Sequence, residues 1–561
     1  MAHEIQYMFK SKRFVWIMAA VFGVVIMFQY FEFPYGGVVS SLLTAGSPQP
    51  PSSSPASLTP PTMMANTIVS APLKTSLNKP INVSAPNLDH NFKEQSEVSG
   101  QKPFVSADNS STKVIPTVRK SHMRPLRDTV TIPVMHDNSL TKMIPTVRKS
   151  HMRPLRDTVT IPMMHNILLH NRASVHSMKP RWSSMVDQEL LYAKSQIENA
   201  GVNDMITNDD PSIYRNISRF KSSYKLMEKT LKVYIYKEGE KPIFHQPEPV
   251  LSGIYASEGW FMRNIQESRH FVTKNPKKAH LFYIPFSSRI LELNLYVPGS
   301  HSKRKLVQYL KNYIDMIAGR YNFWNRTGGS DHFVVACHDW ATYETRKSMD
   351  SCIRALCNSD VNKEYFELGK DVSLPETLVR SSKNPLRELG GKPPSQRSVL
   401  AFFAGRMHGN LRPILLKHWE NKDPDMKIFG KLQKNNTSYV EYMKSSKYCI
   451  CAKGYEVNSP RVVEAIFHEC VPVIISDNFV PPFFEILNWE SFSVFVQEKD
   501  IPNLKNILLA ISYKRYRVMQ ARVKKVQKHF LWHVKPVKYD VFHMILHSIW
   551  YNRVFRVNPI I

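Results

Sequence analysis

Hydrophobic and polar positions in the second half of the chain follow two alternating patterns. Short runs of β-branched and aromatic residues predict buried strands, and apolar positions three and four residues apart predict helices. The first predicted strands are LKVYIY (231–236), HLFYIP (280–285) and HFVVAC (332–337), with a predicted helix over 303–321 between the last two. Strands that alternate with helices are typical of a parallel sheet covered on both faces.

A second series of the same kind begins at residue 398, after a polar, Gly- and Pro-rich stretch over 381–397 that is typical of a linker. Its predicted elements are the strands SVLAFFAG (398–405), KYCICA (447–452), CVPVIIS (470–476) and FSVFV (492–496) and the helices 411–419 and 459–469. We therefore predict an α/β fold of two lobes that face each other across a cleft, with ligands beyond the carboxyl ends of the strands. The predicted divisions are a first lobe over 187–390, a second lobe over 391–540 and a C-terminal segment over 541–561.

The amino-terminal pattern is different, because residues 14–31 form one nearly uncharged apolar run. A run of about 18 such residues is long enough to span a bilayer. Lys10, Lys12 and Arg13 precede it, which predicts an uncleaved signal anchor with residues 1–13 in the cytosol and the remainder in a lumen. A cleaved signal peptide is the alternative, but it usually has a shorter apolar run and an A-x-A cleavage site, which is absent here.

Residues 32–186 predict a disordered stem. They include SPQPPSSSPASLTPPT and show little apolar periodicity, so burial cannot offset the entropy of ordering them. The segment 112–136 recurs almost unchanged as 141–165, and two copies are too few for a solenoid. The repeat is either a basic docking patch or a duplicated spacer, and we favour the spacer. A short amphipathic helix is predicted over 187–200, and globular sequence begins near Ser212.

Charge and cysteine content limit the possible partners of the protein and the possible roles of its cysteines. The net charge of +29 suits a membrane surface, an anionic substrate or nucleic acid, but no zinc-finger, RRM-like or KH-like pattern accompanies it, so we predict no nucleic-acid partner. The six cysteines match no common zinc-site spacing, and a lumen permits disulfides. Cys352 and Cys357 are close enough in sequence to pair, although the connectivity stays open. The candidate N-glycosylation sites are Asn82, Asn109, Asn216, Asn325, Asn435 and Asn436.

The segment SPRVVEAIFHEC (459–470) carries candidate chemistry. Arg461, Glu464 and His468 form a polar stripe on one face of a predicted helix whose other positions are apolar. Arg461 suits bidentate contact with a phosphate, and Glu464 can accept hydrogen bonds from sugar hydroxyls. A salt bridge between Arg461 and Glu464 within the helix is the alternative interpretation.

Loops after two predicted strands of the second lobe have the pattern of phosphate sites. After KYCICA, Ser459 can N-cap the next helix with Pro460 at its first position, so backbone N–H groups and the helix dipole face the loop. Lys453 in the same loop adds positive charge. After SVLAFFAG, Gly405 and Arg406 lie in a second loop that precedes a helix. Two such loops in one lobe favour a nucleotide site.

Several segments together resemble one known family. ELLYAKSQIENA, LKVYIYKEGEKP, AHLFYIPF, RYNFWNRTGGSDHFVVACHDW, CIRALC, FFAGRMHGNLRP and SPRVVEAIFHECVPVIISD are similar to segments of the exostosin family, glycosyltransferase family 47, and of its plant members in particular. The resemblance implies a single-pass type II Golgi membrane protein with two Rossmann-like lobes of the GT-B type. It also implies transfer of a sugar from a nucleotide sugar, usually a UDP-sugar, with inversion, to a cell-wall polysaccharide or a glycoprotein glycan, and complexes with other glycosyltransferases.

The resemblance also assigns the donor site. Its residues here are Ser459, Arg461 and Glu464, with Gly405 and Arg406 beside them. One departure is Glu469, which stands where the family pattern has a glycine suited to end the helix. The sequence DPD at 423–425 lies in a polar loop with no strand before it, so we interpret it as chance and expect no metal requirement.

An inverting transfer needs a general base for the acceptor hydroxyl and positive charge for the departing diphosphate. Because the second lobe supplies the cations, we expect the base in the first lobe. The candidates are Asp339, His338, Glu258 and Asp331. His338 and Asp339 follow the carboxyl end of a predicted strand, where sites lie in such sheets. For each candidate a purely structural role is an equal alternative.

Two other classes of function stay open. A non-catalytic, sugar-binding partner subunit of a glycosyltransferase complex would keep the fold without turnover. A glycoside hydrolase would need two facing carboxylates, and no such pair stands out in the sequence. Stabilisation by UDP would separate a transferase from a hydrolase. No pattern in the sequence specifies the sugar, the acceptor or the linkage.

Overall fold

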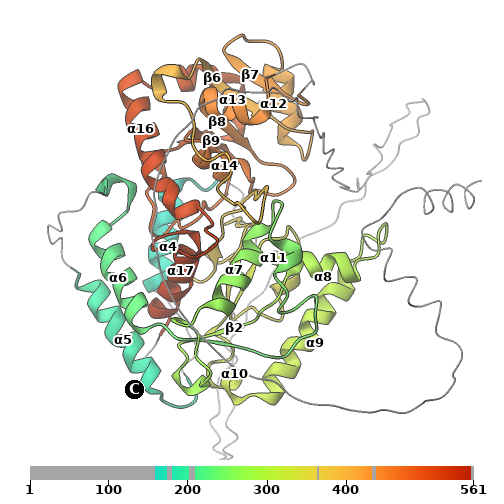
Figure 1. Cartoon of the computed structure of the whole chain (residues 1–561), viewed down its shortest axis with the longest axis vertical. Helices are drawn as coiled ribbons and strands as arrows, with labels where there is room; N and C mark the ends of the chain where they lie inside the picture. Colours follow the sequence, from blue (N-terminus) through green and yellow to red (C-terminus); the bar gives the residue numbers. More distant parts are fainter. Residues whose placement is uncertain (1–157, 174–179, 201–208, 363–364, 433–436, 558–561) are drawn as a thin grey trace, which may run out of the picture. The chain divides into compact units, whose positions relative to one another are not determined.

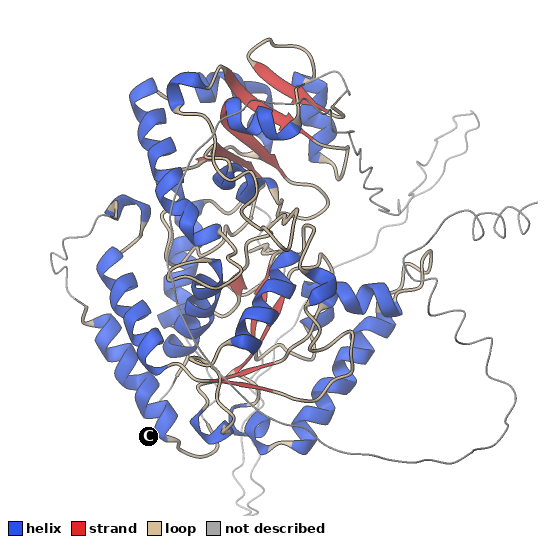
Figure 2. Cartoon of the chain, in the orientation of Figure 1, coloured by secondary structure: helices blue, strands red, loops and turns tan. Residues whose placement is uncertain are grey.

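The structure, a computed structural model, describes residues 158–173, 180–200, 209–362, 365–432 and 437–557. Helices alternate with strands through these ranges, and the strands form two separate sheets (Figure 1, Figure 2). Each sheet has five strands, and all the strand pairs are parallel. The prediction of an α/β fold with two parallel-sheet lobes is therefore confirmed.

The first lobe contains the sheet β1-β2-β3-β4-β5, in which the strands lie in chain order. Their bounds are β1 Val233–Ile235, β2 Leu281–Tyr283, β3 His332–Ala336, β4 Ile353–Leu356 and β5 Val372–Ser373. The strands from β2 to β5 are buried at every position, as expected where helices cover both faces of a sheet. Because the strands are parallel, the residues that follow them meet at one edge of the sheet.

The second lobe contains the sheet β10-β9-β8-β6-β7. The bounds are β6 Val399–Ala404, β7 Met426–Phe429, β8 Ser446–Ala452, β9 Val471–Ile475 and β10 Val494–Phe495. The chain moves from β6 to β7 on one side, and then returns to β8 on the other side of β6. Ligands of open α/β sheets bind at the carboxyl ends of the strands where the order reverses in this way, here β6 and β8.

Helices cover both sheets. In the first lobe they are α5 Met185–Glu198, α6 Ile217–Thr230, α7 Ala256–Glu267, α8 Ser288–Leu295, α9 Arg304–Arg320, α10 Asn322–Thr327 and α11 Ala341–Thr345. In the second lobe they are α12 Leu411–Trp419, α13 Tyr439–Ser445, α14 Arg461–Phe467, α15 Leu504–Leu509 and α16 Tyr513–Val526. The last helix, α17 Val541–Phe555, is buried at every position except His543 and packs on α5, α6, α7, β4 and β5. The described part of the predicted C-terminal segment therefore belongs to the first lobe.

The predicted stem is wrong at its carboxyl end, because residues 161–173 form the helix α4 (Ile161–Ala173). Ile161, Met164 and Leu168 lie on one face of this helix and are buried in the core of the first lobe. Their spacing is helical, but the surrounding Met and His residues obscured the pattern in the sequence. The last two residues of the predicted stem also belong to a helix, α5, and its residues 32–157 and 174–179 fall outside the described residues.

Most other predicted elements are confirmed. The seven predicted strands correspond to β1, β2, β3, β6, β8, β9 and β10, and the helices over 303–321 and 411–419 correspond to α9 and α12. The strands β4 and β7 were not predicted, because Arg354 and Lys427 interrupt their apolar runs, and the two-residue strand β5 was also missed. The predicted membrane anchor over 14–31 lies outside the described residues, and within the described ranges no helix is long and apolar enough to cross a bilayer.

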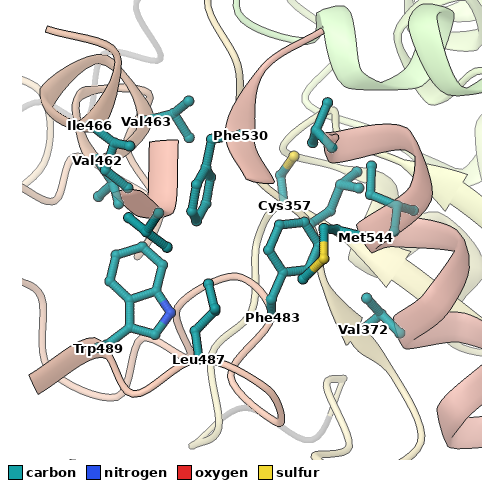
Figure 3. Close-up of a cluster of buried hydrophobic side chains, with 14 of the residues drawn as sticks. Cys357, Val372, Val462, Val463, Ile466, Phe483, Leu487, Trp489, Phe530 and Met544 are labelled. Carbon is teal, nitrogen blue, oxygen red and sulfur yellow. The ribbon is translucent and has the colours of Figure 1, made fainter. Parts of the chain in front are cut away.

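The two lobes share an apolar junction, in which side chains from both sheets' helices and loops pack together (Figure 3). The ring of Phe530 lies 5.5 Å from that of Phe483 and 5.8 Å from that of Trp489, measured between centroids. Val463 of α14 lies on one side of this group, and Met544 of α17 lies on the other (Figure 3).

Three polar contacts, which we call the lobe bridges, also join the lobes. Asn458 Nδ2 donates to Glu376 Oε2 at 2.8 Å, and Arg380 Nη2 donates to Glu464 Oε1 at 2.7 Å. The third bridge is a hydrogen bond from Asn358 Nδ2 to Glu456 Oε2. In each bridge one partner follows a strand of the first lobe, and the other lies in or after the loop that follows β8.

Two disulfides lie beside the strand ends. Cys337–Cys357 joins the residues that follow β3 and β4, and Cys449–Cys470 joins β8 to the residue before β9. A Cys352–Cys357 pair is therefore wrong, because Cys352 precedes β4 and Cys357 follows it, which places the two at opposite ends of that strand.

Candidate functional site

Two loops of the second lobe pack backbone against backbone at the ends of β6 and β8. The first covers residues 405–410 and the second covers residues 453–458. A Cβ added to Gly409, which has a φ of +69°, would lie 2.2 Å from the carbonyl oxygen of Gly454. The two glycines therefore allow the loops to meet, and the meeting fixes the first turns of α12 and α14 at the same edge of the sheet.

Arg461 folds back onto the end of β6. Its Nη2 and Nε donate to the carbonyl oxygen of Ala404 at 2.8 and 3.2 Å, and its guanidinium lies 5.1 Å from the centroid of the Phe403 ring. A Cβ added to Gly405 would lie only 2.6 Å from Arg461 Nη2. The structure thus brings the predicted residues Gly405 and Arg461 together, and Gly405 supplies the space that the guanidinium occupies.

The predicted helix cap at Ser459 is wrong. The helix α14 begins at Arg461, its N-cap residue is Pro460, and no side chain caps it. Ser459 is buried, and its Oγ accepts a long hydrogen bond of 3.5 Å from Arg461 Nη1. The Ser459 side chain therefore contacts the arginine, while its backbone carbonyl oxygen accepts from the N–H of Val462 at 3.1 Å in the first turn of α14.

A second arginine, Arg412, lies beside Arg461 and was not predicted. It belongs to the first turn of α12 and is 7% exposed, and its Nη1 and Nη2 donate to the carbonyl oxygens of Arg406 and Ala452 at 3.4 and 3.5 Å. Its buried Nε has no partner. Burial and the neighbouring charge of Arg461 lower the pKa of Arg412 to about 10. A buried guanidinium group on long hydrogen bonds to neutral carbonyls, beside a half-buried second group of the same charge, forms a site that an anion would stabilise.

Glu464 has partners other than Arg461. Its Oε1 accepts from Arg380 Nη2 at 2.7 Å and its Oε2 accepts from the Tyr439 hydroxyl at 3.1 Å, with 5% of the residue exposed. The alternative of an Arg461–Glu464 salt bridge within the helix is therefore wrong. The carboxylate lies at the lobe junction, beside a small cavity of about 20 Å³ that Glu464, Arg380 and Thr377 help to line.

The remaining predicted donor residues, Arg406 and Lys453, lie in the two loops that follow β6 and β8. Arg406 is exposed, and its carbonyl oxygen accepts from Arg412. Lys453 Nζ forms an ion pair of 2.5 Å with Glu498 Oε1. The charge of Lys453 is therefore balanced within the second lobe.

The far end of the polar stripe on α14 is structural. His468 is fully buried and its Nδ1 lies 3.4 Å from the carbonyl oxygen of Gly390, while burial and the charge of Arg380 lower its pKa to about 4. Glu469 has a φ of 55°, in the left-handed region, and the N–H of Cys470 bonds the carbonyl oxygen of Ala465 to close the helix. Glu469 thus occupies a conformation that favours glycine, as the sequence indicated.

Asp339 lies at the corresponding edge of the first lobe. It follows β3, is half-buried, and hydrogen-bonds the hydroxyl of Tyr255. Burial and the charge of Glu456 raise its pKa to about 6, while Lys303 and Arg289 act in the opposite direction. A carboxylate with this pKa is ionised at neutral pH and remains a competent proton acceptor.

Glu376, which was not predicted, links the two lobes of the site. It follows β5, is 6% exposed, and accepts the lobe bridge from Asn458. Burial and then the charge of Asp339 raise its pKa well above the usual range, and the charges of Arg461 and Arg412 oppose this shift. Glu376 therefore lies within electrostatic reach of the base candidate and of both arginines. Its place at a strand end was not recognisable in the sequence, because β5 directly follows Lys370 and Asp371 and leaves no apolar run.

Two of the predicted base candidates hold the Asp339 loop in place. Glu258 of α7 is fully buried, and its Oε1 accepts from the backbone N–H groups of Cys337 and His338 at 2.7 and 2.9 Å. Its Oε2 accepts from Ser287 Oγ at 2.6 Å. His338 is buried, and burial together with the charges of Arg289 and Lys303 lowers its pKa to about 3. Glu258 is therefore a positioning residue, and His338 is a weak base.

Asp331 lies at the other end of β3, away from Asp339. Its Oδ1 accepts from Thr327 Oγ1 at 2.6 Å and pairs with His332 Nδ1 at 2.8 Å, and its Oδ2 accepts from Arg326 Nη2 at 3.3 Å. Despite burial, these partners hold the pKa of Asp331 well below its usual range. The structure therefore separates Asp331 from the other candidates.

Within the described residues no group of three or more His, Cys, Asp and Glu side chains could hold a metal ion. The DPD sequence precedes β7 and does not follow a strand of its own. Lys505 Nζ pairs with Asp423 Oδ2 at 2.6 Å and with Asp425 Oδ2 at 3.1 Å.

Comparison with known proteins places this site in a family. The model of the exostosin GT47 domain matches residues 227–511, about half of the chain. A probable glycosyltransferase from Arabidopsis thaliana is 43% identical over 400 residues, which are 69% of this chain and 76% of that protein. The chain belongs to the exostosin GT47 family. It is therefore a glycosyltransferase, and the resemblance found in the sequence is confirmed.

More distant members of the exostosin GT47 family carry more specific names. A probable beta-1,4-xylosyltransferase from Arabidopsis thaliana is 29% identical over 344 residues, 57% of this chain and 81% of that protein. A probable glucuronosyltransferase from Physcomitrium patens is 31% identical over 340 residues, 57% of this chain and 75% of that protein. Among solved structures, TarM covers 44% of this chain and 57% of its own with a TM-score of 0.24 and 10% identity, a likeness too small to support an argument.

Proposed function

We propose that this glycosyltransferase moves a sugar from a UDP-sugar to a glycan hydroxyl, with inversion at the anomeric carbon, between lobes arranged as in the GT-B type. The observation that carries the proposal is a pair of neighbouring guanidinium groups, the buried Arg412 and the half-buried Arg461, at the switch point between β6 and β8. A family of glycosyltransferases uses a nucleotide sugar and a glycan acceptor, and a diphosphate is the anion that such a pair fits.

In this proposal the two arginines stabilise the leaving group. When the bond between the anomeric carbon and the diphosphate oxygen breaks, its electron pair stays on the diphosphate and the negative charge there grows. Arg461, held on Ala404 and Phe403, and Arg412, held on backbone carbonyls, are fixed before that charge appears. Preorganised donors of this kind lower the barrier most. We propose that these guanidinium groups, and not a divalent cation, supply the positive charge.

Asp339 is the general base in this proposal. It takes the proton of the acceptor hydroxyl as the oxygen attacks the anomeric carbon from the face opposite the diphosphate, which produces inversion. The Tyr255 hydroxyl orients the carboxylate, and Glu258 orients the loop that carries it. Glu376 is less suited to accept a proton, because burial and the charge of Asp339 raise its pKa and so favour its protonated form, and an incoming diphosphate would raise that pKa further.

Glu464 is the proposed contact for the nucleoside. Its two oxygens each accept one hydrogen bond in this structure, and a carboxylate has about four lone-pair sites. The ribose hydroxyls of the donor would use the remaining sites, far from the bond that breaks. The loss of Glu464 should therefore affect binding more than the chemical step.

The acceptor and the location are also proposals. Relatives named as xylosyl- and glucuronosyltransferases support a cell-wall polysaccharide as the acceptor class. Two disulfides in the described part of the chain support an oxidising lumen, and the apolar run over 14–31 supports a Golgi type II anchor. On sealed Golgi vesicles, a C-terminal tag should resist protease until detergent is added, and digestion without detergent would contradict this topology.

UDP titration and donor turnover of three variants test the proposed roles. Asp339→Asn should bind UDP as the wild type does and lose about 10²- to 10⁴-fold in kcat. Arg461→Lys should lose both UDP affinity and kcat, since it keeps the charge without the bidentate geometry. Glu464→Gln should mainly weaken UDP binding. Arg517→Lys, at an exposed position on α16, is the matched control and should leave both quantities unchanged.

The outcomes separate the proposal from its alternatives. Unchanged UDP affinity in Arg461→Lys together with a much lower melting temperature would show that Arg461 is only a structural residue. Full turnover in Asp339→Asn would assign the base elsewhere. Activity that survives EDTA is expected, and activity that is lost in EDTA and restored by a divalent cation would contradict the role given to the arginines.

A further inference from the structure

A cavity of about 230 Å³ lies outside the proposed donor site, where α4, α6, α17 and the loop around Glu485 meet. Its charged lining consists of Arg172 of α4, Arg215 and Arg219 at the start of α6, and Glu485. None of these residues takes part in the site described above. The volume corresponds to about seven waters at about 30 Å³ each, which is the size of one small polar molecule.

The arginines carry buried donors that have no partner. Arg172 Nε and Nη2, Arg215 Nη2 and Arg219 Nε are all buried without a hydrogen bond. A buried guanidinium donor without an acceptor costs free energy, and three such groups beside one carboxylate add mutual repulsion. Burial lowers the pKa values of Arg172 and Arg215, and the charge of Arg219 lowers that of Arg172 further.

The arginines are nevertheless held in place. Arg215 Nε donates to the carbonyl oxygen of Phe484 at 2.7 Å, and its guanidinium lies 4.3 Å from the centroid of the Phe484 ring. The guanidinium of Arg172 lies 4.8 Å from the centroid of the Tyr551 ring on α17. The free N–H groups are thus fixed on rigid elements, which is the arrangement of a preformed anion site.

Glu485 makes the cavity more selective than a plain anion site. Its buried Oε1 also has no hydrogen-bond partner, although the arginines line the same cavity. An inorganic anion offers acceptors to the arginines and would be repelled by this carboxylate. A ligand that carries both an anionic group and hydroxyl groups would satisfy the guanidinium donors with the first and Glu485 with the second.

We propose that this cavity binds an acidic monosaccharide unit, with its anionic group on Arg172, Arg215 and Arg219 and a hydroxyl group on Glu485. The anionic group is a carboxylate or a phosphate, from a uronate unit of a glycan or from a sugar phosphate. The exposed residues Leu169 and Asn216 line the cavity as well, so a ligand can enter from solvent. The cavity then serves as an accessory carbohydrate site, independent of the donor site.

Calorimetric titration and thermal shift of the purified full chain test this, with glucuronate, glucose 1-phosphate, inorganic phosphate and glucose as separate probes. At least one of the two acidic sugars should bind and raise the melting temperature, and the better of the two identifies the anionic group. Inorganic phosphate should bind more weakly and glucose should not bind. Binding should be unchanged by saturating UDP.

Variants assign the binding to this cavity. Arg219→Gln should weaken the acidic sugar by about tenfold or more, since a hydrogen bond to a charged group is lost. It should melt no lower than the wild type without ligand, because it removes a repelling charge. Glu485→Ala should reduce the preference for the acidic sugar over inorganic phosphate, and Arg517→Lys is the neutral control.

Four results would overturn the proposal. The first is the absence of binding by either acidic sugar, which would mean that water fills the cavity. The second is equal binding of inorganic phosphate, which would remove the role of the hydroxyl groups. The third is competition with UDP, which would assign the ligand to the donor site. The fourth is an unchanged affinity in Arg219→Gln.

Discussion

The fit between Gly405 and Arg461 makes a sharp prediction for the variant Gly405→Ala. The new Cβ would lie 2.6 Å from Arg461 Nη2 and 3.2 Å from its Cζ. Ordinary contacts between such atoms lie at about 3.5–4.0 Å, so the guanidinium has to move by roughly 1 Å. Gly405 is not among the glycines with positive φ, so alanine brings no backbone strain of its own. The new Cβ would also lie 3.1 Å from Phe403 Cζ, so the variant should fold with Arg461 displaced and the Phe403 ring shifted by a few tenths of an ångström.

The size of the effect follows from the contacts of Arg461. Its two hydrogen bonds to the carbonyl oxygen of Ala404, at 2.8 and 3.2 Å, would be weakened or lost. Each such bond is worth about 1 kcal/mol net. If the guanidinium is displaced from the proposed diphosphate position by this amount, UDP binding should weaken by about 1–2 kcal/mol, which is roughly 5- to 30-fold in Kd.

A double-mutant cycle provides the decisive assay. UDP affinity is measured by calorimetry for the wild type, Gly405→Ala, Arg461→Ala and the double variant, with melting temperatures as the check on folding. In the absence of the guanidinium, the alanine at position 405 meets only the edge of the Phe403 ring, at 3.1 Å, so the double variant should bind UDP nearly like Arg461→Ala alone. Equal losses from Gly405→Ala in both backgrounds would refute the reasoning. Gly319→Ala is the control, since Gly319 lies in α9 with nothing within 4 Å of an added Cβ.

Three further predictions concern the base, a helix end and a disulfide. The kcat/KM for transfer should fall as the pH decreases through about 6, because Asp339 must be ionised to accept a proton. Lys303→Met removes a charge that lowers the pKa of Asp339, so the acidic limb of the pH profile should move to higher pH. An acidic limb that stays in place would contradict the assignment of Asp339 as the base. Glu469→Gly should raise the free energy of unfolding, measured by urea titration, by about 0.5–1 kcal/mol, because glycine relieves the backbone strain at φ 55°. The greater freedom of glycine in the unfolded chain offsets only part of this gain. A lower free energy of unfolding would contradict the prediction. Replacing Cys337 and Cys357 together by alanine should lower the free energy of unfolding by about 2–4 kcal/mol, and an unchanged value would mean that the bridge restrains little.

The fold was largely predictable because parallel strands that are buried on both faces leave a continuous apolar signal. That signal requires an uninterrupted apolar run in the sequence: the segments around β3 and β8 have one and were predicted, whereas β5 directly follows Lys370 and Asp371 and was not. For the same reason Glu376 was missed, since no recognisable strand pointed to the residues that follow it. The helix α4 was missed because two of its three buried residues, Ile161 and Met164, lie within the second copy of a repeat whose composition predicted disorder.

The candidate site was predictable in its second lobe and less so in its first. Gly405 and Arg461 follow strands in loops with a recognisable pattern, and the structure brings them together. Arg412 was missed because nothing in the sequence shows that an arginine in the first turn of α12 folds back onto the loops. The first-lobe carboxylates could not be ranked from the sequence. Asp339 and Glu258 differ only in the hydrogen bonds that surround them, and those depend on tertiary contacts.

The lobe bridges described above have a consequence for the speed of the enzyme. Asn458 and Glu456 belong to the loop that would cradle the diphosphate, and Glu464 is the proposed nucleoside contact, so the side chains that hold the lobes together are also those next to the donor. For the cleft to open, these contacts must break at a cost of about 1 kcal/mol or more each. Entry of the donor and departure of UDP then become an exchange of one set of hydrogen bonds for another. Because these interlobe hydrogen bonds must break before UDP can leave, we expect product release, and not bond formation, to be the slow step of the catalytic cycle.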